Sequence, residues 1–483
     1  MAVGLSQSAA RGGITTIVVQ ALRMVISLGT TMVVARILSP GDFGLVAMVT
    51  SLAGLAEILR DFGLFNAAIQ ARSLTQGQKS NLLWLNFALG LTAAVIIYFS
   101  ASAIAAFYDE PRLEQIVQLF SLTFIFNGLA TQFRAEITRN LKFLQINLCE
   151  ILPQLIACSV SIYLAYTGIS YWALVIQHVI TAFLGLILAT TLSGWMPGLP
   201  SRKENMRKLM GYGSTLTGTQ LLSYLVRNID TIALGKIFGP TAVGFYDRAY
   251  QVLLLPLGQI NAPLTRVAVP VLAKIQDDKI RFEAYLQRAQ LVACYVTVTI
   301  FAITAALAPS IVVVLFGSNW SQSGDILRLL AVGGIFRSLM QITYWTYLAK
   351  GMTKTQLKFD LVVLPIVAAC MLLGLTWGPL GVAAGHSVGY GLYWFIGLLW
   401  MGNKADVDVQ PLLVNSTKSI CLIAAPVAVT SYFIARQFGD PLLQTLVGAL
   451  AGIFVAAIMT WAVPILRTDA RKLYETFQMA VKR

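Results

Sequence analysis

Charged residues are scarce in this sequence. Of its 483 residues, 12% are charged and 57% are hydrophobic, whereas a soluble protein usually carries about 25% charged residues. So few polar side chains cannot cover a water-soluble globule of this size. The composition therefore excludes an ordinary soluble protein and favours a chain whose solvent is lipid.

Residues and motifs for metal, redox or nucleotide chemistry are also few. The five cysteines lie within or next to apolar segments: Cys149, Cys158, Cys294, Cys370 and Cys421. No two of them form a CxxC pair, so neither a zinc site nor a disulfide framework is indicated. His178 and His386 stand far apart in apolar stretches, where packing explains them best. The GxxxxGK[ST] motif is absent, which argues against an ATP-driven pump. We expect no metal, no cofactor and no catalytic residue.

The net charge of +14 does not indicate nucleic-acid binding. The basic residues lie mostly between apolar stretches, and no basic helix carries interleaved aromatic residues. We therefore expect membrane lipids rather than nucleic acid around this chain.

Long apolar segments dominate what is present. A bilayer core requires about 20 mostly apolar residues per helix, and this length predicts about fourteen spans. They are roughly 14–38, 43–69, 82–107, 114–133, 146–166, 171–192, 212–238, 243–270, 290–316, 326–349, 359–377, 379–401, 417–436 and 441–466. The first segment is too long for the core of a signal peptide, so we interpret it as a retained span. The fold class is an all-α polytopic membrane protein.

Lysine and arginine in the loops predict the orientation of these spans. Segments that follow even-numbered spans are basic, including Arg134, Arg139 and Lys142 after the fourth, whereas the opposite loops are short and poor in cations. Because cytoplasmic loops carry the excess of Lys and Arg, both termini are predicted to face the cytoplasm.

The chain contains an internal repeat at an offset of 200 residues. Residues 35–44, ARILSPGDFG, align with residues 235–244, GKIFGPTAVG, and Gln20 aligns with Gln220. Six spans separate the copies, so the repeat is parallel and predicts two similar lobes around a central cavity. The predicted organisation is an N-terminal lobe at 1–192, a cytoplasmic linker at 193–211, a C-terminal lobe at 212–401, and the last two spans with the tail at 402–483.

Several arginines fall inside predicted spans. They are Arg23, Arg60, Arg227, Arg248, Arg266 and Arg337. An arginine at the centre of a membrane helix costs about 2.5–3.5 kcal/mol on insertion scales. Such residues should therefore face a water-filled cavity or an opposite charge, and we interpret this set as a cationic substrate-binding cavity.

Polar stripes on matched helices support this interpretation. Spacings of three and four residues put each set on one helix face: Gln20, Arg23, Ser27 and Thr30 in the first span, and Gln220, Ser223, Arg227 and Asp230 in the seventh. Asn261 adds a polar cavity candidate in the eighth span. The acidic residues Glu57, Asp61, Asp230 and Asp247 are candidates for ion coupling. For any single residue, a structural ion pair between helices is an equally good account.

Two stretches carry a resemblance to a known family. ARILSPGDFGLVAM at 35–48 looks like the first hairpin of Wzx-type polysaccharide flippases. GPTAVGFYDRAYQVLLLPLGQINAPLTRVAVPVLAKIQDD at 239–278 closely resembles the second-half hairpin of the colanic-acid-exporter branch. That family belongs to the multidrug/oligosaccharidyl-lipid/polysaccharide exporter superfamily.

The resemblance implies a fourteen-helix, two-lobed transporter of the bacterial inner membrane that alternates between inward- and outward-open states. Its substrate would be an undecaprenyl-pyrophosphate-linked oligosaccharide, moved to the outer leaflet for surface polysaccharide assembly. A polysaccharide polymerase and chain-length machinery are the implied partner proteins. Coupling to inward protons or sodium is a further hypothesis.

Two alternatives remain open at this point. A multidrug or cation antiporter of the same superfamily is the nearest one, although a cavity for cationic drugs should be acidic. An enzyme that polymerises or ligates polysaccharide would generally need a large external loop, and none is visible in the sequence.

Overall fold

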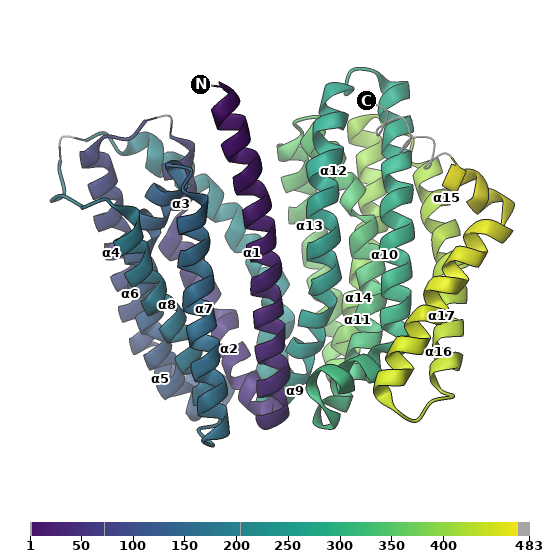
Figure 1. The fold of residues 1–483 in the computed structure, drawn as a ribbon, viewed down its shortest axis with the longest axis horizontal. Coiled ribbons are helices and arrows are strands. Elements are labelled where there is room, and N and C mark those ends of the chain that lie inside the picture. The colour runs from purple at the N-terminus through teal and green to yellow at the C-terminus, as the bar shows by residue number, and fades with distance from the viewer. Residues whose placement is uncertain (1, 72, 203, 472–483) are drawn as a thin grey trace. The chain divides into compact units, whose positions relative to one another are not determined.

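The computed structural model of the chain consists of helices and the loops that join them (Figure 1). It describes the backbone of residues 2–71, 73–202 and 204–471, and the side chains of those residues except 2–17, 207–208, 211–216, 218–219 and 222–223. No strand occurs in these backbone ranges. The described chain forms two compact units, Met1–Gly244 and Phe245–Arg483.

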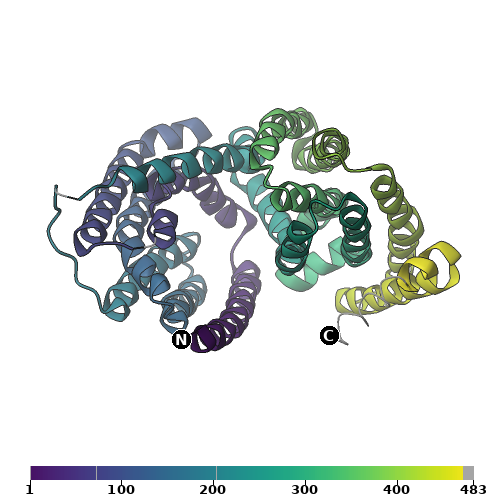
Figure 2. The same cartoon turned by 90° about the horizontal axis from the view of Figure 1, so that it is seen from above.

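The first unit contains eight helices and the beginning of a ninth. They are α1 (Ala2–Ile37), α2 (Pro40–Asp61), α3 (Leu64–Gln70), α4 (Gln76–Phe99), α5 (Ala101–Tyr108), α6 (Arg112–Arg139), α7 (Phe143–Tyr166), α8 (Trp172–Ser193) and the start of α9 (Arg207–Lys274). Helix α6 packs against α4 and α8, and α7 packs against α1 and α8. Figure 2 shows the helices of this unit side by side as a bundle.

Glycine allows α4 and α6 to approach closely. A Cβ at Gly90 would lie 2.7 Å from the carbonyl oxygen of Phe124, and one at Gly128 would lie 2.8 Å from that of Asn86. Small residues at such crossings let helix backbones pack tightly in membrane proteins. Helix α6 is thereby fixed in the middle of the first unit.

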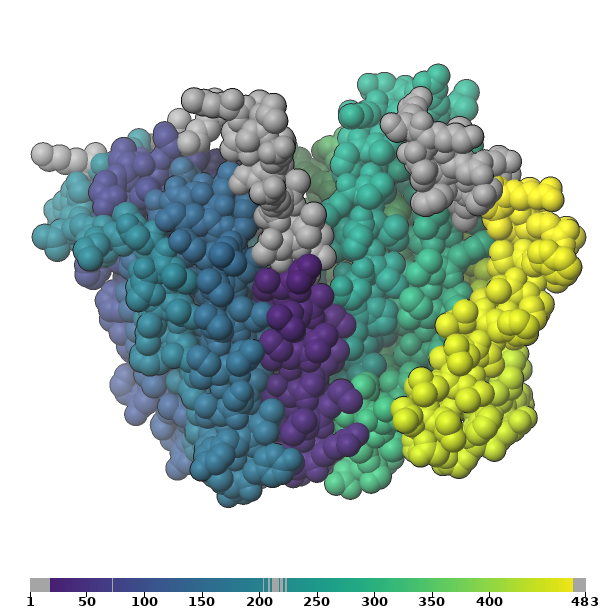
Figure 3. Space-filling view, viewed as in Figure 1, coloured from purple at the N-terminus to yellow at the C-terminus, as the bar shows by residue number. Residues whose placement is uncertain are grey.

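The second unit continues from Phe245 to the C-terminal end. Its elements are the rest of α9, α10 (Lys279–Phe316), η1 (Ser318–Trp320), α11 (Ser321–Leu339), α12 (Gln341–Ala349), α13 (Thr353–Gly374), η2 (Leu375–Trp377), α14 (Gly378–Ala405), α15 (Gln410–Ser419), η3 (Ile420–Ala424), α16 (Ala425–Ala435) and α17 (Pro441–Ala462). Helix α11 packs against α10 and α14, and α17 packs against α16 and α10. Helix α17, yellow in Figure 3, lies at the surface, and only 11% of its most apolar 18-residue stretch is buried.

Twelve segments of the described chain are long and apolar enough to cross a membrane. This confirms the polytopic all-α class. Two of the segments, Tyr224–Lys274 and Thr353–Ala405, have 51 and 53 residues. Both contain a break, since Gly239 has φ 75° and ψ −175° and η2 separates α13 from α14. A bilayer crossing takes about 20 residues, so each segment is long enough for two crossings; the total of fourteen remains a prediction.

The ends of two predicted spans differ from the helices. The span at 43–69 stops at Asp61, because Phe62 and Gly63 have positive φ (44° and 62°) and a separate helix, α3, follows. The span at 114–133 is too short, because α6 continues to Arg139. Arg134 and Arg139 are therefore helical residues and not loop residues.

The two copies of the repeat contact each other within the first unit. A Cβ at Gly44 would lie 1.7 Å from the carbonyl oxygen of Pro240, and one at Gly244 would lie 1.8 Å from that of Pro40. The contact is thus reciprocal at the offset of 200. The boundary between the compact units falls just after this contact, whereas the sequence-based division places a linker at 193–211; that division and the two lobes remain predictions.

Candidate functional site

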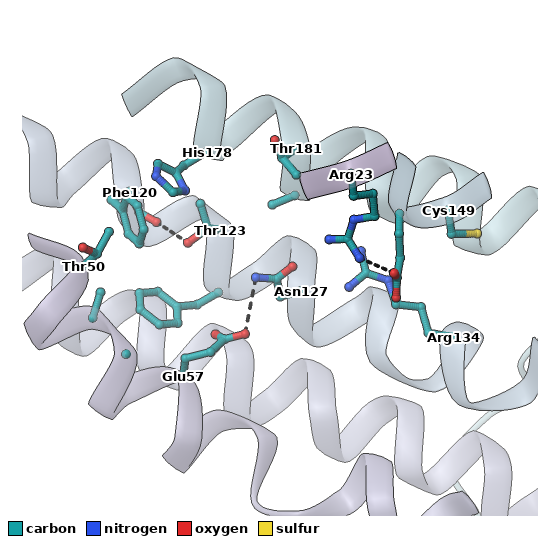
Figure 4. Close-up of a pocket in the computed structure, with 15 residues that line it drawn as sticks. Arg23, Thr50, Glu57, Phe120, Thr123, Asn127, Arg134, Cys149, His178 and Thr181 are labelled. Atoms are coloured by element: carbon teal, nitrogen blue, oxygen red, sulfur yellow. Dashed lines mark hydrogen bonds and ion pairs between the residues drawn. The ribbon is translucent and has the colours of Figure 1, made fainter. Parts of the chain in front are cut away.

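A cavity of about 380 Å³ lies inside the first unit (Figure 4). Its walls come from helices α1, α2, α6, α7 and α8. Its volume is within the usual range of roughly 300–1,000 Å³ for small-molecule sites. Packing places α6 along it, because Leu83, Ala130, Phe133 and Cys149 form a buried cluster that joins α4, α6 and α7.

Arg23 extends from α1 into this cavity, where the guanidinium forms an ion pair with Glu150 of α7. Its Nε also donates to Oε1 of Gln154 at 3.0 Å. The side chains of Arg23 and Glu150 remain 37% and 39% exposed, so water or a ligand can reach the pair. The pair neutralises one cation of the cavity.

Arg134 extends into the same cavity from α6. Its Nε is buried and has no hydrogen-bond partner in the described part of the chain. No carboxylate there lies within 4.0 Å of its guanidinium. A Cβ at Gly185 of α8 would lie 2.4 Å from its Nη2, so glycine at that position makes room for the arginine. Arg134 therefore adds a cation without an ion pair.

Glu57 of α2 lines the cavity next to these groups. Its carboxylate accepts from Nε and Nη2 of Arg60 at 3.0 and 2.9 Å, and Arg60 Nη1 donates to Thr131 at 2.9 Å. Asn127 donates to Glu57 at 3.4 Å. Glu57 and Arg60 therefore neutralise each other within α2, and Arg60 is 6% exposed and does not line the cavity.

The cavity lining contains two arginines, Arg23 and Arg134, and two glutamates, Glu57 and Glu150, so its formal charges balance in number but are unevenly placed. Arg23 pairs with Glu150, and Arg60 pairs with Glu57. At the end of the cavity that holds Arg23 and Arg134, the lining carboxylate is Glu150, so one positive charge is in excess at that end. This end favours an anionic ligand.

The other residues predicted from the first-unit stripes have mixed surroundings. Thr30 and Asp230 are buried, Asp61 and Gln220 are half-buried, and Gln20, Ser27 and Arg227 are exposed. Asp230 accepts a hydrogen bond from the backbone N–H of Thr231 at 2.8 Å. The side chain of Ser223 lies outside the described residues. None of the others lines the cavity in the described part of the unit.

The predicted residues of the second unit form separate contacts. Arg248 is buried, and its Nη2 lies 2.6 Å from Asp247 Oδ2. Arg337 donates from Nη1 to the Tyr250 hydroxyl at 2.8 Å and lies 5.1 Å from the ring centre of Tyr390. Arg266 is exposed and Asn261 is half-buried. A cavity shared with the first unit remains a prediction.

Sequence reasoning missed Arg134 as a cavity residue because the fourth span was ended one residue too early. The apolar run stops at Phe133, yet the helix continues to Arg139. Nη1 of Arg139 donates to the carbonyl of Ala71 at 2.7 Å, and Ala71 is the residue that follows α3. The seven-residue spacing of Phe120, Asn127 and Arg134 was the available signal, since it repeats on one helix face.

No group of three or more His, Cys, Asp or Glu side chains that could hold a metal occurs among the described residues. The chemistry of the site is that of charge, hydrogen bonding and aromatic surface.

A family model described as "Polysaccharide biosynthesis protein" matches residues 33–325, more than half of the chain. The lipopolysaccharide biosynthesis protein WzxC of Escherichia coli (strain K12) is 26% identical over 413 residues, which cover 83% of this chain and 82% of WzxC. The teichuronic acid biosynthesis protein TuaB of Bacillus subtilis (strain 168) is 26% identical over 330 residues, with 67% and 68% covered. The succinoglycan biosynthesis transport protein ExoT of Rhizobium meliloti (strain 1021) is 21% identical over 460 residues, with 94% and 92% covered.

Solved transporters share the fold. The lipid II flippase MurJ in an inward closed conformation matches with a TM-score of 0.72 at 16% identity, over 92% of this chain and 98% of MurJ. An inward-facing multidrug resistance transporter of the MATE family matches with a TM-score of 0.60 at 15% identity, over 80% of this chain and 94% of that one.

Proposed function

The chain belongs to the polysaccharide biosynthesis protein family, and from this premise we propose that it is a flippase for a lipid-linked oligosaccharide. The names of the relatives support a role in surface polysaccharide assembly, and ExoT is named a transport protein. The fold similarity to the lipid II flippase MurJ fits the same kind of transport. The proposal is transport between membrane leaflets and not catalysis.

The observation that carries this proposal is Arg134 in the cavity of the first unit. A cation without an ion pair inside a membrane helix is costly unless it is hydrated or binds an anion. Arginine presents paired N–H donors that match phosphate oxygens. We therefore assign the Arg23–Arg134 end of the cavity to the pyrophosphate of an undecaprenyl-pyrophosphate-linked oligosaccharide, with the polyprenyl tail remaining in lipid.

The membrane and the coupling follow from the same proposal. The proposed substrate is made at the cytoplasmic leaflet, so the protein would act in the bacterial inner membrane. The basic loops place both termini in the cytoplasm. The polymerase and chain-length machinery are its proposed partner proteins. Asp230 is the candidate that we would test first for ion coupling, because it is a buried carboxyl group on the helix that repeats α1. Loss of ion-dependent flipping by folded Asp230→Asn would support coupling, and unchanged ion dependence would remove Asp230 from this role.

The proposal is tested by a flipping assay in proteoliposomes with undecaprenyl-pyrophosphate-linked oligosaccharide. The intact protein is compared with Arg134→Gln, Arg23→Ala and Arg227→Ala, and Arg288→Gln is the matched control because it removes one exposed arginine outside the cavity. A lost hydrogen bond to a charged group costs about 1.5–3 kcal/mol. We expect roughly tenfold to hundredfold slower flipping by Arg134→Gln and no change in Arg288→Gln.

Each result has a defined consequence. Equal flipping by folded Arg134→Gln, Arg23→Ala and intact protein would disprove the assignment of this cavity to pyrophosphate. No flipping by intact protein, together with export of cationic dyes, would replace the proposal with the drug-antiporter alternative.

A further inference from the structure

The cavity of the first unit has two chemically different ends (Figure 4). Arg23 and Arg134 lie at one end, where Glu150 pairs with Arg23, and Phe120, Thr123 and His178 lie at the other, with Asn127 between the two ends. Helix α6 carries both ends. Phe120 and Arg134 are roughly 21 Å apart along the helix axis at 1.5 Å per residue, and nearly four full turns separate them, so they share a face.

The hydroxyl groups of Thr50 and Thr123 at the Phe120 end, and of Thr181 near the middle of the cavity, already donate their hydrogen atoms to backbone carbonyls. Thr123 donates to the carbonyl of Phe120 at 2.6 Å, Thr181 to that of Gln177 at 2.7 Å, and Thr50 to that of Ala47 at 3.2 Å. A hydroxyl has one donor and two acceptor lone pairs. The capacity that remains toward the cavity is therefore to accept hydrogen bonds.

Glu57 and Asn127 extend this acceptor character toward the middle of the cavity. The Glu57 carboxylate is acceptor-only. One N–H of the Asn127 amide donates to it, which leaves the Asn127 carbonyl as an acceptor and the second N–H as a donor. A ligand with several O–H donors can satisfy these groups. A ligand with a negative charge at this position would find no arginine to pair with, because Arg60 is already paired with Glu57 and does not line the cavity.

An aromatic surface completes this end. The rings of Phe120 and His178 are 5.6 Å apart and inclined by 57°, and both line the cavity. The face of an aromatic ring is electronegative and attracts the positive edges of C–H bonds. A pyranose ring has such a C–H face, with its hydroxyl groups arranged around the rim.

We propose that the Phe120 end of the cavity is a sugar subsite that accepts an uncharged, hydroxyl-bearing sugar of the lipid-linked substrate. This inference rests on the proposed function, because it takes the Arg23–Arg134 end as the pyrophosphate site. The head group then lies along one face of α6, with pyrophosphate on the donor-rich end and sugar on the acceptor-rich end. The subsite selects against a uronic acid in this position.

The test measures binding of defined probes to the purified full-length protein in nanodiscs. The probes are undecaprenyl pyrophosphate without sugar, the same lipid with a neutral disaccharide, and the same lipid with a uronic-acid-containing disaccharide. The variants are Phe120→Leu and Thr181→Val. Their controls are Phe126→Leu, whose ring packs on Phe183 away from the cavity, and Thr190→Val, which is on α8 with the same kind of hydroxyl bond to its own helix.

We expect the two variants to bind the neutral glycolipid about threefold to tenfold more weakly, as loss of an aromatic contact or a hydrogen bond of about 0.5–1.5 kcal/mol would produce. Their affinity for the sugar-free lipid should not change, and the controls should match the intact protein. The intact protein should bind the acidic glycolipid more weakly than the neutral one.

Three outcomes would overturn the inference. Equal weakening toward sugar-free and glycosylated lipid would make these residues structural, and no weakening toward either would exclude the subsite. Equal affinity of intact protein for neutral and acidic disaccharides would refute the charge selection. In each of these cases the proposed function stands, whereas failure of intact protein to bind any of the three lipids would overturn both proposals.

Discussion

Three arginines of the first unit have the same charge but different surroundings. Arg60 is buried and makes three hydrogen bonds to Glu57 and Thr131. Arg23 shares the cavity with a half-exposed glutamate partner, and Arg134 has no ion pair among the described residues. Charge inside a span therefore identifies a set of candidates, and the partners decide which of them can bind a ligand.

The Glu57–Arg60 pair predicts a stability effect at the residue scale. Glu57→Gln should lower the free energy of unfolding by about 1–3 kcal/mol, because it leaves the buried Arg60 guanidinium with a neutral partner. The measurement is the unfolding midpoint of the purified protein in detergent.

The double variant Glu57→Gln/Arg60→Leu supplies the control for this pair. It should lose less stability than the sum of the two single variants, because residues of one ion pair are coupled. Simple additivity would show that the pair contributes nothing to stability.

At the scale of elements, the two copies of the repeat turn at the same position by different means. Ser39 begins α2 with a capping box, in which its side chain accepts from the N–H of Asp42 and the Asp42 carboxylate accepts from the N–H of Ser39. Its counterpart, Gly239, has no side chain and turns through φ 75° and ψ −175°. This region of backbone space is accessible almost only to glycine.

Gly239→Ala should therefore destabilise the protein by about 1–3 kcal/mol, since alanine is strained in that conformation. Gly258→Ala is the matched control on the same helix, because a Cβ there would meet nothing within 4 Å. Thermal unfolding of both variants is the measurement. Equal midpoints would mean that the break at Gly239 does not require glycine.

The contact between the repeat copies makes a second prediction at this scale. Gly44→Ala should cost about 1–3 kcal/mol, because its Cβ would overlap the carbonyl of Pro240 and force α2 away from α9. Gly29→Ala, where a Cβ would have nothing within 4 Å, should be neutral or stabilising by up to about 1 kcal/mol. A stable Gly44→Ala variant with an unchanged unfolding midpoint would contradict the close approach.

At the scale of the whole molecule, transport of an anionic head group should respond to the membrane potential. Moving two negative charges outward from a negative interior is favoured by about 4–5 kcal/mol per 100 mV. We expect proteoliposomes with a potassium diffusion potential to flip the proposed substrate faster when the compartment holding the substrate is negative. A rate that is independent of the sign of the potential would indicate that compensating cations move with the head group.

The sequence by itself determined that the chain is embedded in lipid, that it is all-helical, and where the repeat lies. Hydropathy is local, so a run of about 20 apolar residues specifies a span without knowledge of its neighbours. The repeat likewise identified two hairpins by their proline and glycine, Pro40 with Gly44 and Pro240 with Gly244. In the structure the chain turns just before each proline, and the two copies contact each other at these residues.

Only the tertiary structure decided which polar residues meet. Arg134 follows an apolar run and resembles a loop residue in the sequence. In the structure α6 packs between α4 and α8 and extends past Arg134, and its side chain points into the cavity. Arg60 matched the cavity prediction as well as Arg23 did, but Glu57 and Thr131 surround it. Partners far apart in the chain set the hydration and charge of each group, and a periodic pattern records only the face on which a residue lies.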